Sequence, residues 1–120
     1  MSEYKVKFYI DIKTNESPVL KYISRLREKE AAKILKYIDF LRENKGYLEE
    51  PLSKHIKGKI RELRVDFGQK RHRAFYFTFI KKTIIILHCF IKKTKKTPNS
   101  EIKKAEENYK NILKNPKVYE

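Results

Sequence analysis

The chain has 120 residues, a length typical of one domain, so we expect a single domain over residues 1–120. Hydrophobic residues make up 40% of it and aromatic residues 12%, which excludes a wholly disordered chain although 38% of the residues are charged. One cysteine excludes an internal disulfide framework and a cysteine-rich zinc module. The sequence has no run near 18 apolar residues and no signal-peptide pattern, so we expect a soluble, cytoplasmic protein without a membrane partner.

The positive charge is concentrated in the second half of the sequence. Lysine and arginine number 30 against 15 acidic residues, which gives a net charge of +15. Residues 51–100 contain 14 basic and 2 acidic side chains, so this segment alone carries a net charge of +12. Charge that served only solubility would be spread more evenly, and the segment is therefore predicted to contact nucleic acid.

The first part of the sequence predicts one strand and two helices. Apolar and polar residues alternate over residues 3–10, which is the period of a strand. Ser17-Pro18 has the form of a helix N-cap followed by proline at the first helical position, and it predicts a helix over residues 18–28. Apolar residues recur every three or four positions over residues 29–44 and predict a second helix.

The remaining elements follow from the same periods. They are a loop over residues 47–58, strands over residues 60–66, 73–80 and 84–91, and a helix that begins with a second cap signal at Thr97-Pro98 and ends before Pro116. The run over 84–91 is apolar throughout, which is typical of a central strand covered on both faces. Phe75, Phe77 and Phe79 share one side of their strand and are expected in the core.

The element order is β-α-α-β-β-β-α, which predicts an α+β fold. Short turns join the last three strands, so we expect them to form an antiparallel meander, with the first strand at an edge of a small, mostly antiparallel sheet. The helices are expected to pack on one face of this sheet and to leave the opposite face open and polar.

Three segments in order carry a resemblance to a known family. They are Gly58-Lys59-Ile60-Arg61-Glu62-Leu63-Arg64, then Arg71-His72-Arg73-Ala74-Phe75-Tyr76, then Leu87-His88-Cys89-Phe90-Ile91-Lys92-Lys93-Thr94-Lys95-Lys96-Thr97-Pro98. As a set they resemble the RelE/ParE/HigB toxin superfamily, and most of all its phage-derived, HigB-like branch. The resemblance covers about residues 50–115, and the β-α-α start fits it as well.

This resemblance implies a RelE-like fold and the toxin of a type II toxin–antitoxin pair. Most toxins of the superfamily cleave mRNA in the ribosomal decoding site without a cofactor, whereas a smaller ParE-like group inhibits DNA gyrase. The implied partners are a cognate antitoxin, often with a helix-turn-helix domain, together with the ribosome and mRNA. A non-catalytic RNA-binding module remains a further alternative, since a basic meander suits it equally.

The requirements of metal-free RNA cleavage indicate which residues are candidates for catalysis. Arginine suits the transition state because it is always charged and binds phosphate through two nitrogens, so Arg64 and Arg73, at the positions where the family has arginines, come first. A base and an acid are also needed, for which His55, His72 and Lys93 are candidates. Glu62 is an alternative base, and whether His88 is structural or functional stays open.

Two groups of basic residues flank these candidates and are predicted to bind RNA. They are Lys54, Lys57, Lys59 and Arg71 on one side, and Lys92, Lys95 and Lys96, beside Lys93, on the other. The three histidines and Cys89 have no close metal-ligand spacing, so no metal site is predicted.

Overall fold

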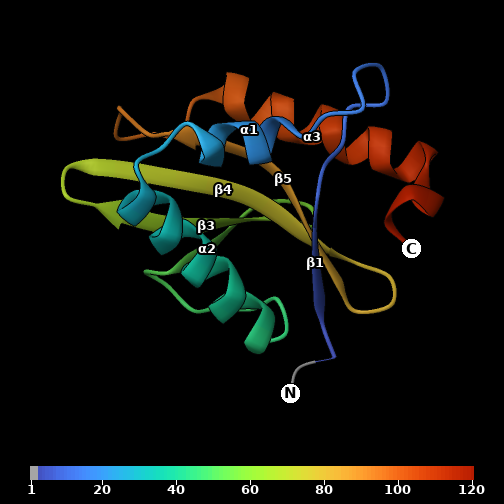
Figure 1. Ribbon diagram of the computed structural model, residues 1–120, viewed down its shortest axis with the longest axis horizontal. Coiled ribbons are helices and arrows are strands. Elements are labelled where there is room, and N and C mark those ends of the chain that lie inside the picture. The colour runs from blue at the N-terminus through green and yellow to red at the C-terminus, as the bar shows by residue number, and fades with distance from the viewer. Residues whose placement is uncertain (1–2) are drawn as a thin grey trace.

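The computed structural model describes residues 3–120 and, over them, forms an α+β fold of three helices and a five-stranded, mostly antiparallel open sheet (Figure 1). The predicted fold class is therefore confirmed. In chain order the elements are β1 (Lys5–Phe8), α1 (Pro18–Ser24), α2 (Glu28–Glu43), β2 (Ser53–Lys57), β3 (Ile60–Phe67), β4 (Lys70–Phe79), β5 (Thr83–Ile91), α3 (Asn99–Lys114) and a short 3-10 helix, η1 (Pro116–Tyr119).

The strands lie in the order β1-β5-β4-β3-β2. Strands β2 to β5 form an antiparallel meander, which confirms the predicted pairing of the last three strands. Strand β1 lies at the other edge and runs parallel to β5, with Lys5 opposite Thr83 and Phe8 opposite Ile86. Strand β5 is therefore an inner strand only along its first half, because β1 ends where the second half begins.

Helices cover both faces of the sheet, whereas the sequence predicted cover on one. Helices α1 and α2 pack on the α2 face, formed by Leu63, Val65, Ala74, Tyr76, Ile84 and Ile86. Helix α3 packs on the α3 face, formed by Phe75, Phe77, Ile85, Leu87 and Phe90. Strands β4 and β5 carry large apolar side chains on both sides, so one layer of helices could not have kept both sides from water. Phe75 and Phe77 are buried and Phe79 packs against them, which confirms that they belong to the core.

Element boundaries differ from the prediction in several places. Strand β2 lies in a segment predicted to be a loop, because an edge strand with mostly exposed polar residues has no strong period. Helix α1 ends at Ser24 instead of residue 28, although Ser17 caps it as predicted, accepting a hydrogen bond from the Leu20 amide at 3.2 Å. Helix α3 has Pro98, and not Thr97, at its N-cap, with no side-chain cap bond.

A two-residue turn, Gly68-Gln69, joins β3 to β4 and fixes their register. Gly68 has a φ of +59°, a conformation that glycine adopts without steric cost and that tight hairpins require. Because side chains alternate along a strand, this register decides which residues of the two strands share a face. Strand β4 begins at Lys70, three residues earlier than predicted, so the whole segment 71–73 lies within the hairpin.

Candidate nucleic-acid interface on the α3 face

The register places Arg64 of β3 directly opposite Arg73 of β4. Side chains of a directly opposed antiparallel pair project to the same face. The next pair on the same face is Glu62 with Phe75, two positions along the hairpin, and Phe75 belongs to the α3 face. The structure therefore brings together, on this face, the two arginines that the sequence placed first.

Two more cations join them. Arg71 lies opposite Asp66, two pairs nearer the turn and therefore on the same face, and its carbonyl oxygen accepts a hydrogen bond from the Lys92 amide at 2.8 Å. Burial lowers the pKa of the Lys92 ammonium, and the Glu62 carboxylate opposes this shift. The positive charges of the three arginines lower the same pKa further, so that it lies below its ordinary value. We call Arg64, Arg71, Arg73 and Lys92 the basic cluster.

Two carboxylates accompany the basic cluster. The Nε atom of Arg64 donates to Oε1 of Glu62 at 2.9 Å, and Nη1 of Arg73 donates to Oδ1 of Asp66 at 2.8 Å. Glu62 is fully buried, whereas the Asp66 side chain is 59% exposed. The Arg64–Glu62 pair is thus fixed within the sheet, while the Asp66 contact lies at the surface, where solvent weakens it.

Two atoms of the basic cluster and its carboxylates are buried without a hydrogen-bond partner among residues 3–120. They are Oε2 of Glu62 and Nε of Arg73. A buried polar group left unpaired costs about 1–3 kcal/mol, so native structures keep few of them. Both belong to side chains on the same face of neighbouring strands, so the basic cluster carries unpaired polar atoms beneath its surface.

His72 does not belong to the basic cluster, although it is the sequence neighbour of Arg73. Successive residues of a strand point to opposite faces, and His72 is buried on the α2 face. Its Nδ1 lies 2.6 Å from the Tyr22 hydroxyl, and its Nε2 contacts the buried Glu30 carboxylate of α2. Lys70 approaches the same carboxylate at 3.4 Å. These contacts join α1, α2 and β4 and keep His72 away from the two arginines.

His55 and several of the predicted RNA-binding lysines are scattered around the sheet. His55 lies on the edge strand β2 opposite Arg61, on the α2 face, and its Nε2 is 2.7 Å from the Gly58 carbonyl oxygen. Lys54 lies opposite Glu62 and so belongs to the α3 face, near the basic cluster. Lys57 forms an ion pair with Glu106 of α3 at 3.1 Å. The others are exposed in connections: Lys59 in the β2–β3 turn, and Lys93, Lys95 and Lys96 after β5.

His88 is the histidine whose role, structural or functional, the sequence leaves open. It lies on the α3 face, opposite Phe75 and two positions before Phe90, and its ring stacks on that of Phe90 at 5.7 Å. Its Nε2 is 2.7 Å from Oε1 of Glu101 in the first turn of α3. The alternation of β5 predicts this shared face, because His88, Phe90 and Lys92 are two residues apart. The same spacing singles out Lys92 instead of the predicted Lys93.

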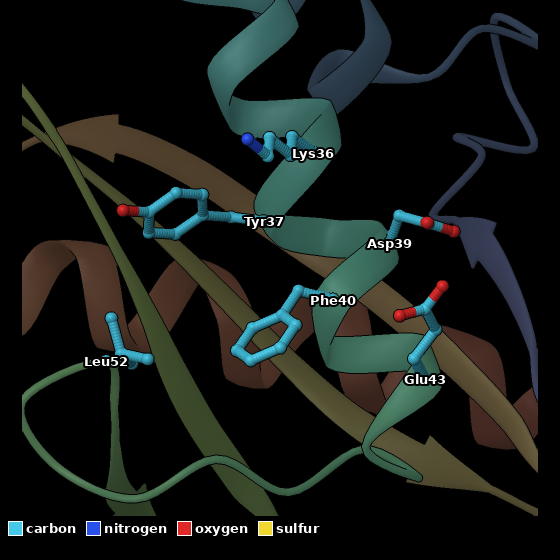
Figure 2. A pocket seen from close by; sticks show the side chains of 6 residues that line it. All are labelled: Lys36, Tyr37, Asp39, Phe40, Glu43 and Leu52. Atoms are coloured by element: carbon cyan, nitrogen blue, oxygen red, sulfur yellow. The ribbon is translucent and has the colours of Figure 1, made fainter.

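A separate pocket lies on the other side of the sheet, against the outer surface of α2. Figure 2 shows Tyr37 and Phe40 of α2 above Leu52, with Lys36, Asp39 and Glu43 around them. The lining is mainly aromatic and aliphatic, and it contains no histidine, cysteine or arginine. This pocket can hold an apolar group, whereas the basic cluster lies on the α3 face. Within residues 3–120, no cluster of three or more His, Cys, Asp or Glu side chains could hold a metal ion.

Comparison with known proteins identifies a family for this chain. The family model described as Phage derived protein Gp49-like (DUF891) matches residues 21–110, which is most of the chain and includes β2 to β5 and the whole basic cluster. No curated protein matches the sequence. None of the helices within residues 3–120 has the length and apolar composition of a membrane span. The Gp49-like family is a toxin-like, phage-derived family within the RelE/HigB-like toxin clan. The chain belongs to the Gp49-like family.

Proposed function

We propose that the chain is the toxin of a type II toxin–antitoxin pair and acts as a ribosome-dependent mRNA endoribonuclease. The observation that carries this proposal is the basic cluster, in which four cations gather on one face of β3, β4 and the end of β5. A phosphate of the RNA backbone would supply acceptors for the solvent-accessible cations Arg64, Arg71 and Lys92. The membership of the Gp49-like family supports the toxin role and an antitoxin partner, for which a helix-turn-helix protein is the expected type.

The arrangement suits cleavage by the 2′-hydroxyl of the RNA itself. The oxygen attacks the neighbouring phosphorus, a base takes its proton, and the bond to the leaving 5′-oxygen breaks as an acid protonates that oxygen. Arg64 and Arg73 would bind the equatorial phosphate oxygens, whose negative charge grows in the transition state. Lys92 would donate the proton to the 5′-oxygen, because its surroundings lower the pKa of its ammonium and so make the proton easier to release.

The base is assigned to His88 in this proposal. Glu101 holds the His88 ring through Nε2, and such a carboxylate fixes the orientation of an imidazole. His88 lies on the same face as the two arginines, whereas His55 and His72 lie on the α2 face. We therefore leave the latter two out of the proposed site and keep Lys54, Lys93, Lys95 and Lys96 as contacts for the RNA backbone.

A non-catalytic RNA-binding module is the second candidate. The observation that favours it is that Arg64 and Arg73 each already pair with a carboxylate, which lowers the charge available to a transition state. Such a module would bind RNA with a steep salt dependence and would leave it intact.

Mapping of cleavage sites separates these functions. A reporter mRNA is incubated with the protein in an active translation extract, and a second sample is incubated without ribosomes, after which primer extension locates the cuts. The nuclease proposal expects cuts in frame with codons, only during translation, and expects Arg73→Ala to reduce them about 100-fold or more. Arg27→Ala, which removes an exposed arginine at the start of α2, is the matched control and should leave cleavage unchanged.

The outcomes discriminate clearly. Intact mRNA in both samples contradicts the nuclease, and retained RNA binding would then favour the module. Because Arg73 is buried, the variant must first show a normal thermal unfolding transition. A folded Arg73→Ala variant that still cleaves at the rate of the unmodified protein would place the site elsewhere.

A further inference from the structure

The second half of β5 has no strand beside it on one side. Strand β1 pairs with residues Thr83–Ile86, and the Tyr9 amide then donates to the Ile86 carbonyl oxygen at 2.9 Å. Beyond this point the chain turns away, and the Ile10 amide donates to the Tyr119 hydroxyl instead. Residues 87–91 of β5 therefore form an edge of the sheet although β5 is an inner strand along its first half.

The direction of the backbone groups along this edge follows from two hydrogen bonds. The Lys92 amide donates to Arg71 of β4, so residues 88, 90 and 92 direct their amides toward β4. The Leu87 carbonyl oxygen accepts a bond from the Asn108 side chain of α3 at 2.9 Å, on the opposite side. By the two-residue period of a strand, the N–H and C=O groups of Cys89 and Ile91 also point outward at this edge. The backbone of an added strand could pair with them there.

The edge lies at the bottom of a groove between α1 and α3, which flank β5 in Figure 1. The groove has a volume of about 470 Å³ and an apolar floor that includes Tyr22, Leu26 and Cys89. Its rim is basic, with exposed Arg25 on one side and exposed Lys104 on the other. Glu101, the nearest acidic side chain of α3, is turned to His88.

We propose that this edge binds an extended segment of a partner protein, which pairs with residues 87–91 as an added strand and directs acidic side chains to Arg25 and Lys104. The proposal rests on the proposed function only for the identity of the partner, which would be the antitoxin. A peptide fits better than RNA, because alternating N–H and C=O groups at strand spacing match another peptide backbone and not a phosphate chain.

Because this edge lies beside the basic cluster, a segment bound to it would also regulate binding at that cluster. Strand β5 ends at Ile91, and the next residue is Lys92 of the basic cluster. A segment paired along 87–91 spans about 17 Å at 3.3 Å per residue, and two or three further residues would lie over Lys92. The partner would thereby block phosphate binding from a neighbouring site, without replacing any of the contacts within the basic cluster.

The test uses a fluorescein-labelled, eight-residue peptide of alternating glutamate and valine, with binding followed by fluorescence anisotropy. We expect saturable binding that falls about tenfold or more in the double variant R25E/K104E. The variant K29E/K110E makes the same charge change at exposed lysines outside the groove and should bind as the unmodified protein does. A peptide of the same sequence with N-methyl groups on alternate amides keeps its charge and loses its donors, and it should not bind.

A second measurement locates the peptide. Amide hydrogen exchange followed by NMR should show that the amides of Cys89 and Ile91 slow at least tenfold on binding. Failure of the peptide to bind overturns the proposal, and so do equal binding of the N-methylated peptide or equal loss in K29E/K110E. Displacement of the peptide by a short single-stranded RNA, with RNA affinity reduced by R25E/K104E, would assign the groove to RNA. None of these measurements involves RNA cleavage, so the proposal and the nuclease activity can fail separately.

Discussion

Glu62 offers the sharpest test of the basic cluster. Its carboxylate is fully buried, accepts a bond from Arg64 Nε at 2.9 Å, and raises the pKa of Lys92 against the effect of burial and of the arginines. Glu62→Gln keeps the size and one acceptor but removes the negative charge. We expect two opposite effects, a less stable protein and tighter binding of RNA.

The loss of stability can be sized from the contacts. A hydrogen bond between charged groups contributes about 1.5–3 kcal/mol, and the variant keeps a weaker, neutral version of it. Removal of the buried negative charge also leaves the positive charges of the four neighbouring cations less neutralised. The expected loss of stability therefore lies toward the upper end of this range. We therefore expect the free energy of unfolding to fall by about 2 kcal/mol, or the melting temperature by about 8 °C for a chain of this length.

The gain in RNA binding follows from the same charge. With up to four cations engaged, the slope of log K against log salt concentration for single-stranded RNA should be about −3 in the unmodified protein. In Glu62→Gln the affinity at low salt should rise about tenfold, since one repelling charge is gone from the centre of the interface. Urea denaturation gives the stability, and anisotropy titration of a labelled single-stranded RNA at several salt concentrations gives the affinity and slope.

The matched control is Glu107→Gln, which makes the same change at an exposed position of α3. It should alter stability by less than about 0.5 kcal/mol. The reasoning is refuted if Glu62→Gln is as stable as the control and binds RNA with unchanged affinity. In that case Glu62 would not act as the counter-charge of the arginines, and the basic cluster would not be the RNA site.

Two further predictions concern the fold. Burial is the largest single influence on Glu30 and acts to raise its pKa, but the hydrogen bonds and charges of His72 and Lys70 together outweigh it and hold the pKa below the ordinary value of 4.5. A pKa that is lower in the folded state than in the unfolded state contributes stability that is present above pH 4.5 and is lost as the pH falls through the folded-state pKa. Urea denaturation from pH 7 to 3 should show this loss of stability in the unmodified protein. The profile of stability against pH should be flatter in Glu30→Gln. Gly46 has a φ of +82°, and a Cβ there would lie 2.5 Å from Thr78 Oγ1, so Gly46→Ala should cost about 2–3 kcal/mol by thermal unfolding. Gly58→Ala, with a φ of +56° and no atom within 4 Å, should cost only about 1 kcal/mol, and equal costs would contradict this steric argument.

Alternation along strands carried most of what the sequence could predict. It placed Arg64 and Arg73 on paired strands, and it placed Phe75 and Phe77 in the core, because a strong two-residue period follows directly from burial of one face. The same rule, applied one residue further, excludes His72 from the arginine face. The ordinary titration range of histidine makes His72 a candidate from the sequence, but this range says nothing about the direction of a side chain.

Features that depend on tertiary contacts could not be predicted in this way. Strand β2 is held by pairing with β3 and has little apolar pattern of its own. Helices cover both faces of the sheet because α3 packs on the face opposite to α2. The connection over residues 92–98 allows α3 to pack on either face, so the sequence alone does not decide between them. The unpaired atoms of Glu62 and Arg73 arise only when both strands and their neighbours are in place.

The pairing of β1 with β5 has a consequence for synthesis of the protein. Lys5 to Phe8 are made first, yet their partners, Thr83 to Ile86, are separated from them by most of the chain. Contacts so distant in sequence form late and slow the folding of a chain, because a long loop must close before they are gained. During translation β1 must therefore wait for its partner strand to emerge, and Lys92 and α3 emerge later still. The basic cluster is thus completed only after β5 has been made, so Arg64, Arg71 and Arg73 lack their fourth neighbour during all earlier stages of translation.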